Sequence, residues 1–302
     1  MDAGAIPQVR RFNRIVVERI GALGDKFLGR ARPMGETRTL WEIGPEGVQV
    51  RALRARLGLD SGYATRLLQS LERQGLVRVE TSGADRRVRV ARLTEAGLEE
   101  RAEIDRLSDD VASGVLAPLS EGQRERLVSA MAEVERLLKA SMVQFGVEDP
   151  GTAEAQWCIQ QYYAELSRRF EGGFDPSLAR TADVHELRLP AGLLTIARLR
   201  NEPIGCGALK LHPDGIGEIK RLWLSGETRG LGLGRRLLAF IEQHAVDHGM
   251  HTVRLDTNRT LHEAIALYRS TGYFEVAPFN DEPYAHHWFE KRLRMAIPPE
   301  PA

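Results

Sequence analysis

The run Arg229-Gly230-Leu231-Gly232-Leu233-Gly234 leads directly into Arg235-Arg236-Leu237-Leu238-Ala239-Phe240, and this stretch decides the fold of the second half of the chain. Glycine has no Cβ and readily adopts positive φ, so glycines at alternate positions make a loop with accessible amides. The helix predicted to follow adds free N–H groups and the positive end of its dipole. The stretch therefore predicts a site for an anionic group, and a phosphorylated cofactor is the natural ligand.

The spacing of the glycines excludes two common nucleotide-binding loops. A dinucleotide turn requires Gly-x-Gly-x-x-Gly and an acidic residue about 20 residues later. The loop of nucleoside triphosphatases requires Gly-x-x-x-x-Gly-Lys followed by Ser or Thr. The spacing here is Gly-x-Gly-x-Gly, and neither Lys-Ser nor Lys-Thr follows it. A structural turn remains an alternative for the loop taken alone, so its flanks decide.

The flanks alternate between strand and helix patterns. Side chains alternate before the loop, and apolar residues recur at helical spacing after it. The predicted order is a strand over 217–224, the glycine loop, a helix over 233–248, a strand over 252–257, a helix over 261–270 and a strand from 272.

Two segments resemble the GNAT acetyltransferases. Arg229-x-x-Gly232-x-Gly234 resembles motif A of that family, and the segment from Ala264 to Tyr273 resembles its A-x-x-L-Y-x-x-x-G-[FY] sequence. The resemblance covers about residues 155–293. It implies an α/β fold with a central mixed, mainly antiparallel sheet, and direct transfer of an acetyl group from acetyl-CoA to an amine. One departure is that the family's usual first strand is not evident before residue 155.

The resemblance also implies which residues bind acetyl-CoA. The strand before the loop would pair its backbone with the pantetheine arm, and the loop amides would hold the diphosphate beside the charge of Arg229. Asn258 either contacts the cofactor or a water, or is a turn residue. The expected cofactor-binding set is Leu222, Trp223, Leu224, Arg229, Gly230, Leu231, Gly232, Leu233, Gly234, Arg235 and Asn258.

Catalytic residues follow from the same resemblance. Tyr268 matches the family's tyrosine that donates a proton to the leaving thiolate; the alternative is a core aromatic residue. Glu218 occupies a position where several members place a base that deprotonates the amine, and a half-exposed salt-bridging glutamate is the alternative. The helix over 155–170 and the segment 279–284 are expected to line the acceptor site. Whether the acceptor is a small-molecule amine or a protein lysine stays open.

The first half has a different pattern. Residues 51–57 form a short predicted helix that ends at Gly58, and Asp60 or Ser61 caps a second helix. Ala64, Leu67, Leu68 and Leu71 make the apolar stripe of that second helix. A helix with a polar opposite face after a tight turn suits insertion in the DNA major groove.

A predicted β-hairpin follows, with strands over 76–80 and 88–93 and a basic tip. Its Asp85-Arg86-Arg87 tip and the run from Leu93 to Gly97 resemble the MarR family of winged-helix regulators, over about residues 8–140. Residues 38–92 contain eleven Arg and six Asp or Glu, a net charge of +5, whereas the whole chain has 42 basic and 42 acidic residues. This local excess favours a face for double-stranded DNA.

The expected DNA contacts are of two kinds. The wing arginines would contact phosphates and the minor groove, and the polar face of the second helix would reach base edges. A winged helix that contacts only proteins is the alternative. The DNA-binding set is Ser61, Tyr63, Thr65, Arg66, Gln69, Arg73, Arg86, Arg87 and Arg89.

The terminal helices of this half are amphipathic, over about 12–20 and 127–138. Proteins of the MarR family dimerise through such helices, so a homodimer is expected, with two recognition helices about one DNA turn apart.

Composition sets the remaining limits. A length of 302 residues indicates two domains, a MarR-like winged helix-turn-helix over 1–145 (mostly α with a β-hairpin wing) and a GNAT-like domain over 146–302. No apolar run approaches the about 18 residues that span a membrane. Cys158 and Cys206 lack a partner motif, which is typical of a reducing bacterial cytoplasm. No metal site is expected, since no cluster has metal-ligand spacing.

The sequence therefore predicts a fused regulator and N-acetyltransferase. Two alternatives stay open. In one, the second half senses acetyl-CoA or an amine and changes DNA affinity with little catalysis. In the other, the first half is a dimerisation scaffold and the protein is only an acetyltransferase.

Overall fold

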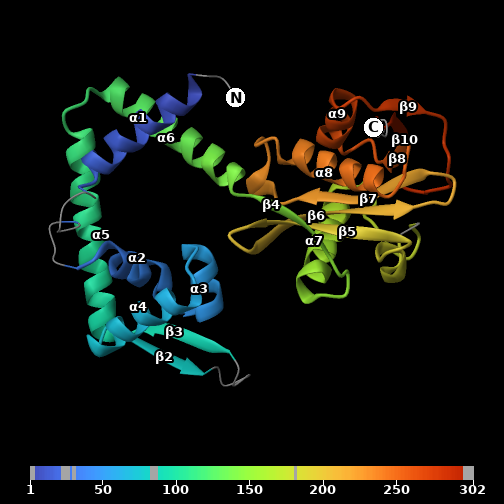
Figure 1. The fold of residues 1–302 in the computed structure, drawn as a ribbon. Helices are drawn as coiled ribbons and strands as arrows, with labels where there is room; N and C mark the ends of the chain where they lie inside the picture. The colour runs from blue at the N-terminus through green and yellow to red at the C-terminus, as the bar shows by residue number, and fades with distance from the viewer. Residues whose placement is uncertain (1–3, 22–27, 29–31, 82–87, 180–181, 295–302) are drawn as a thin grey trace, which may run out of the picture. The chain divides into compact units, whose positions relative to one another are not determined.

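The computed structural model describes residues 4–21, 28, 32–81, 88–179 and 182–294. The chain divides into two compact units, Met1–Ala132 and Glu133–Ala302 (Figure 1). Each unit has its own buried core. Within the described ranges, no helix is both long enough and apolar enough to cross a lipid bilayer.

The first unit is mostly helical with a small sheet of three strands in the order β1-β3-β2. Helix α6 crosses the boundary after Ala132 and continues into the second unit. The elements are α1 (Ala5–Arg19), α2 (Met34–Ile43), β1 (Val48–Gln49), α3 (Val50–Leu57), α4 (Ser61–Arg73), β2 (Val77–Thr81), β3 (Arg89–Leu93), α5 (Glu95–Leu116) and α6 (Glu121–Ser141).

The predicted helix-turn-helix is confirmed as α3 and α4. Gly58 ends α3 in the left-handed region with φ of 65°, which glycine adopts without steric cost. The carboxylate of Asp60 caps α4 by accepting the N–H of Tyr63 at 2.9 Å. The apolar stripe predicted for α4 is buried, and it packs against α2, α3 and the sheet. The unit is the winged helix-turn-helix expected from the sequence.

The wing hairpin pairs β2 with β3 from Val77↔Leu93 to Thr81↔Arg89. The structure explains why Thr94 and Gly97 occupy their positions in the run from Leu93 to Gly97 that follows the wing. The Thr94 hydroxyl accepts the N–H of Gly97 at 3.1 Å, which caps α5, and donates to the Gly75 carbonyl at 2.6 Å. A Cβ on Gly97 would lie 2.0 Å from the Leu76 carbonyl oxygen. The first turn of α5 therefore reaches the base of the wing only because residue 97 is glycine.

The second unit is built on a sheet of seven strands in the order β4-β5-β6-β7-β8-β10-β9. Every neighbouring pair is antiparallel except β7 and β8, which are parallel. This confirms the predicted mixed, mainly antiparallel sheet. The elements are β4 (Gln144–Glu148), α7 (Ala153–Arg169), η2 (Val184–Leu187), β5 (Gly192–Leu199), β6 (Glu202–Leu211), β7 (Ile216–Leu224), η3 (Gly226–Thr228), α8 (Leu233–Asp247), β8 (Thr252–Thr257), α9 (His262–Ser270), β9 (Phe274–Val276) and β10 (His287–Arg292).

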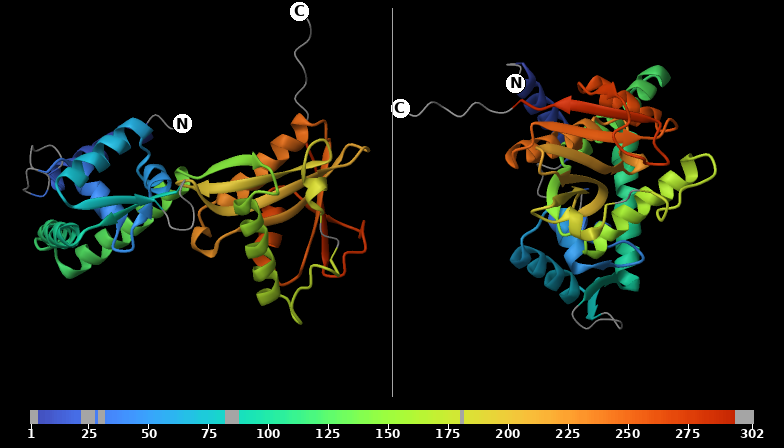
Figure 2. Two further views of the ribbon diagram at one scale, coloured as in Figure 1. Left: turned by 90° about the horizontal axis from the view of Figure 1, so that it is seen from below. Right: turned by 90° about the vertical axis from the view of Figure 1, so that its right-hand side faces the viewer.

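Helices cover both faces of this sheet. Helices α8 and α9 lie on one face and α7 lies on the other, as Figure 1 and Figure 2 show. The larger core joins α8 and α9 to the sheet through residues such as Leu237, Ile241 and Phe289. The smaller core joins α7 to the opposite face through Cys158 and Ile159.

The first strand that the sequence analysis did not find is β4. It pairs with β5 from Gln144↔Arg198 to Glu148↔Leu194. The boundary expected after residue 145 therefore falls inside a strand, and the structure divides the chain at Ala132 instead. Strand β4 is short and contains glycine, and its alternation is too weak to be recognised without its partner β5.

The contact at Gly97 generates a prediction with an internal control. Replacing Gly97 with Ala drives a methyl group into the Leu76 carbonyl, so we expect a loss of about 2 kcal/mol or more in the free energy of unfolding. Gly114 lies in the same helix with no atom within 4 Å of its ideal Cβ. Gly114→Ala should therefore stabilise the protein by about 0.5–1 kcal/mol. Urea unfolding followed by circular dichroism measures both, and equal effects would contradict this account.

Candidate active site and nucleic-acid interface

The site begins where β7 and β8 separate. The two strands pair at Ile216↔Thr252, Gly217↔Val253 and Glu218↔Arg254, and the pairing stops there although β7 runs on to Leu224 and β8 to Thr257. Backbone groups beyond the last pair are therefore free on the edges that face each other. An extended ligand can use such an edge in the way that an added strand does.

A bulge in β7 changes which side chains face the gap. Ala208 of β6 pairs with Lys220 and Cys206 pairs with Trp223, so Arg221 and Leu222 together oppose Gly207. Arg221 has φ of 54°, a conformation that non-glycine residues rarely adopt. Regular alternation is lost, and the consecutive side chains of Lys220, Arg221 and Leu222 line one cavity.

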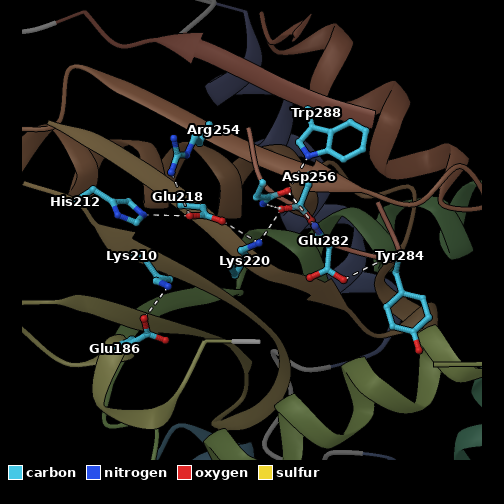
Figure 3. A network of polar contacts seen from close by, with 11 residues as sticks. Glu186, Lys210, His212, Glu218, Lys220, Arg254, Asp256, Glu282, Tyr284 and Trp288 are labelled. Atoms are coloured by element: carbon cyan, nitrogen blue, oxygen red, sulfur yellow. Dashed lines mark hydrogen bonds and ion pairs between the residues drawn. The ribbon is translucent and has the colours of Figure 1, made fainter. Parts of the chain in front are cut away.

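The side chain of Lys220 links the two strands at and just beyond their last backbone pair, Glu218↔Arg254. Its Nζ lies 2.7 Å from Asp256 Oδ2 on β8 and 2.9 Å from Glu218 Oε1 on β7, as Figure 3 shows. Burial opposes the charge of Lys220, but Asp256 and Glu218 outweigh it and raise the lysine pKa. The bridge therefore stays ionised and connects the two strands where their backbone ladder ends.

Glu218 is buried among cations. Besides Lys220, it contacts His212 Nε2 at 3.0 Å and Arg254 Nη2 at 3.7 Å. Burial alone would raise its pKa, but Lys220, His212 and Arg254 together lower it. Glu218 lines neither of the two cavities described below. Its surroundings match the salt-bridging alternative that the sequence left open.

The larger of the two cavities is a cleft of about 580 Å³ between β7, the glycine loop, α7 and α9. Two residues of the predicted cofactor set, Leu231 and Asn258, do not line it. The predicted residues that line it are Leu222, Trp223, Leu224, Arg229, Gly230, Gly232, Leu233, Gly234 and Arg235.

The glycine loop fits an anionic diphosphate. Gly230 and Gly232 have φ of 74° and 72°, and Gly232 precedes α8 without a side-chain cap. An ideal Cβ on Gly232 would meet no atom within 4 Å, so the loop faces open space. Free amides, a helix N-terminus and neighbouring arginines are the donors that bind phosphate groups.

Arg229 contacts a carboxylate in this ligand-free structure. Its guanidinium pairs with Glu165 of α7, which also accepts the indole N–H of Trp223 at 2.8 Å and pairs with Arg169 at 3.3 Å. Glu165 therefore neutralises Arg229 at the wall of the cleft.

The second cavity, of about 100 Å³, adjoins the cleft and is walled by aromatic rings. Tyr162, Leu166, Leu222, Leu261 and Ala264 line both spaces, so the two are continuous. The expectation that α7 and the segment before β10 line this region is met by Tyr162, Tyr163, Phe170, Glu282 and Tyr284.

Tyr268 lies in α9 and lines the second cavity. It is 5% exposed, and its ring packs against Tyr273 and Phe289. Burial, and to a smaller extent the charge of Asp256, raises the pKa of Tyr268. The phenol therefore keeps its proton at neutral pH.

Asp256 is a site residue that the sequence analysis missed. Its Oδ2 accepts from Lys220 Nζ at 2.7 Å and from Asn280 Nδ2 at 3.0 Å, and Trp288 holds Asn280 in turn (Figure 3). Among the described residues Oδ1 has no partner, and Asp256 lines the cavity. The position of Asp256 near the end of β8 could have indicated a site residue in the sequence. The direction of its side chain is shown only by the ion pair with Lys220.

Asn258 is placed differently from the expectation. Its Nδ2 donates to the Tyr284 carbonyl at 2.8 Å, and its Oδ1 accepts from the amide and hydroxyl of Thr260. All of these partners are protein groups, and Asn258 lines the second cavity rather than the cleft. It fixes the segment that carries Tyr284 at the cavity wall.

The predicted DNA contacts on α4 share one exposed face. The buried stripe of α4 leaves Ser61, Tyr63, Thr65, Arg66, Gln69 and Arg73 exposed. Arg89 at the start of β3 is exposed as well, whereas the predicted Arg86 and Arg87 lie outside the described residues. Polar and cationic groups on one helix face are suited to base edges and phosphates.

Comparisons with known proteins agree with both halves. Residues 159–273 match the model of the acetyltransferase (GNAT) family, and residues 32–88 match the MarR family model. An "IAA acetyltransferase" from Azospirillum brasilense is 32% identical over 125 residues, which are 41% of this chain and 82% of the relative. A "Mycothiol acetyltransferase" from Thermomonospora curvata is 30% identical over 129 residues, so the chain spans only 43% of that relative.

Among solved structures, Streptococcus pneumoniae FabT in complex with DNA is 23% identical with a TM-score of 0.37, over 44% of this chain and 94% of that one. The decisive match is the Azospirillum relative, because it combines identity above 30% with coverage of most of the relative's length. The chain therefore belongs to the GNAT acetyltransferase family and carries a MarR-family winged helix ahead of its acetyltransferase domain.

Proposed function

We propose that this protein is an acetyl-CoA-dependent N-acetyltransferase joined to a DNA-binding regulator. The observation that carries the enzymatic half is the continuity of a glycine-lined cleft with a buried aromatic cavity at the separation of β7 and β8. The cleft suits a long phosphorylated ligand, and the cavity suits the end of a smaller acceptor. The wall of the smaller cavity carries the protonated phenol of Tyr268 and the carboxylate of Asp256.

The residues divide the work of direct transfer. Acetyl-CoA, when bound, supplies the acetyl thioester. The amides from Gly230 to Arg235 would hold its diphosphate, with Arg229 released from Glu165 to face the new anion. Leu222 to Leu224 would pair with the pantetheine arm along the free edge of β7. Tyr268 would donate its proton to the departing sulfur.

The carboxylate that receives the amine proton is Asp256 in this proposal, in place of Glu218. Asp256 lines the cavity, and two donors hold its Oδ2 so that Oδ1 faces the acceptor. Glu218 lines neither cavity, and it pairs with the cations Lys220 and Arg254 and contacts His212. A group must reach the proton it accepts, and of Glu218 and Asp256 it is Asp256 that lines the cavity.

The regulatory half rests on the exposed polar face of α4 and the basic wing. We infer that this face binds double-stranded DNA and that the protein acts as a homodimer. Exposed apolar side chains on α1 and α6 support the dimer, including Ile6, Phe12, Ile15, Val128 and Met131, which are 42–60% exposed in the single chain.

Acetyl-CoA sensing is a second candidate function. Arg236 of α8 donates to the carbonyls of Ala140 and Val143 at 2.6 and 3.0 Å, and Leu233 packs on the same two residues. Leu233 is also the first residue of the helix that would hold the diphosphate. The end of α6 is therefore fixed to the first turns of the cofactor helix, which supports coupling between cofactor binding and the regulator.

The role of Tyr268 is tested by replacement with Phe, which keeps the ring contacts and removes the proton. We expect kcat to fall by about 10²–10³-fold with little change in acetyl-CoA affinity. Tyr273→Phe is the control, because that hydroxyl bonds Glu242 at 2.9 Å and lines neither cavity. Steady-state release of free thiol and calorimetric titration of CoA measure the two quantities. Unchanged kcat in Tyr268→Phe would favour the sensing alternative.

The role of Glu218 is tested by Glu218→Gln. The lowered pKa means that Glu218 contributes stability above its ordinary pKa of 4.5, and that this contribution is lost as pH falls through the folded-state value. We expect the variant to lose about 1–3 kcal/mol at pH 7 and the difference to shrink in acid. Urea unfolding at several pH values measures it. Acetyl transfer should fall less than threefold, and a fall of 100-fold would restore Glu218 as the base.

The DNA face is tested by Arg66→Ala against Arg106→Ala. Both arginines are exposed, but Arg106 lies on α5 and pairs with Glu103 and Asp110. We expect Arg66→Ala to weaken binding of duplex DNA about fivefold or more and to lower the salt slope by about one. Fluorescence anisotropy over a range of NaCl concentrations measures both quantities. Equal behaviour of the two variants would support the scaffold interpretation of the first half.

A further inference from the structure

Arg221 is a buried cation that has no counter-ion in the part of the chain that the structure describes. Its residue is 9% exposed, and its Nη2 donates to the Tyr163 hydroxyl at 2.9 Å and to the Ala182 carbonyl at 2.5 Å. Its Nε is buried without a hydrogen-bond partner, and no carboxylate among the described residues forms an ion pair with it. A buried charge with only neutral partners is costly, so its retention calls for an explanation.

The backbone adds a second cost at the same residue. A φ of 54° at a non-glycine residue costs on the order of 1 kcal/mol of conformational free energy. The bulge also interrupts the hydrogen-bond ladder between β6 and β7. The burial of the charge and the unusual backbone conformation together place Arg221 on the wall of the acceptor cavity beside Lys220. The two cations differ, because Lys220 is neutralised by Glu218 and Asp256 whereas Arg221 is not.

Negative charge is also present on the cavity wall. Asp256 and Glu282 both line it. Aromatic rings close the remaining wall, with Tyr163 stacked on Phe174 at 5.5 Å and Phe174 against Tyr284 at 4.9 Å. The cavity therefore offers carboxylates for an ammonium group, a guanidinium for an anion, and an apolar surface.

We propose that the acceptor of this protein is an amino acid with an apolar side chain, and that Arg221 binds its carboxylate. This inference rests on the transferase function proposed above and names the substrate class of that site. The amine lies toward Asp256 and the junction with the cleft, and the apolar side chain lies among the aromatic rings. A carboxylate supplies the counter-ion that Arg221 lacks, and charge-assisted hydrogen bonds make this recognition strong.

The transfer itself balances without a further reactant. The ammonium group first releases one proton to water, and the neutral amino nitrogen then forms a bond to the acetyl carbon while the carbon–sulfur bond of the thioester breaks. The nitrogen proton goes to Asp256, and the sulfur receives the proton of Tyr268. The products are an N-acetylamino acid and the free thiol of CoA, and proton exchange with water restores both side chains.

The experiment compares amino acids with the amines that lack only the carboxylate. L-Leucine is paired with 3-methylbutylamine, L-methionine with 3-(methylthio)propylamine and L-phenylalanine with 2-phenylethylamine. We expect kcat/KM of the full-length protein to favour each amino acid by about 100-fold over its partner. Arg221→Gln should lose about 100-fold on the amino acids and less than threefold on the amines.

Two further variants separate charge from folding. Arg221→Lys keeps a positive charge without the planar fork and should fall between wild type and Arg221→Gln. Arg259→Gln is the matched control, because Arg259 is exposed, pairs with Glu171 and lines neither cavity. Its kinetics should equal those of the wild type. Thermal unfolding of each variant shows whether a loss reflects the site or the fold.

Calorimetric titration of the same compounds onto the CoA-saturated protein distinguishes the two proposals. One outcome is that neither member of any pair is acetylated, while the amino acids bind and Arg221→Gln abolishes that binding. This outcome would contradict the transferase function and support the proposal that Arg221 binds the carboxylate. If the amines react as well as the amino acids, or Arg221→Gln affects both equally, the Arg221 site is overturned while transfer stands. Absence of both turnover and amino-acid binding overturns both.

Discussion

The separation of β7 from β8 is the constraint on which the second half of the protein depends. Three residue pairs join the parallel strands, the last of them Glu218↔Arg254, and the Lys220 side chain then links Glu218 on β7 to Asp256 on β8. The ion bridge replaces the backbone ladder where the ladder ends, so the strands part at a fixed point. The free edge of β7 leads to the glycine loop, and Asp256 lines the smaller cavity beside it. Backbone and side-chain chemistry thus meet at one junction.

The sequence predicted the parts of this site that local patterns encode. The glycine loop, its flanking strand and helix, and Tyr268 all lie in the elements that the sequence predicted, and the predicted order of elements is confirmed from α3 to β3 and from β7 to β9. The catalytic role of Glu218 and the cofactor-binding role of Asn258 stay predictions. Their contacts with other protein groups favour roles in holding the fold. The sequence did not identify Asp256, Lys220 and Arg221 as site residues, because the direction in which their side chains point depends on strand register. A bulge shifts every later side chain by one face, and no pattern of period two reports it.

The two units are linked by a helix that serves both. Helix α6 begins in the winged-helix unit and ends against α8, where Arg236 caps its last carbonyls and Leu233 fills the contact. In the winged helix, the hydroxyl of Thr94 likewise makes two contacts. It caps α5 and fixes the turn after α4. Both contacts place a helix end on the element that carries the chemistry or the recognition face.

The most direct measurement is a crystal structure of the protein with coenzyme A. This account predicts the diphosphate on the amides between Gly230 and Arg235, Arg229 turned from Glu165 toward it, the pantetheine arm along Leu222 to Leu224, and the thiol beside Tyr268. A coenzyme bound elsewhere, or a loop closed by its own side chains with Arg229 still paired to Glu165, would contradict the account.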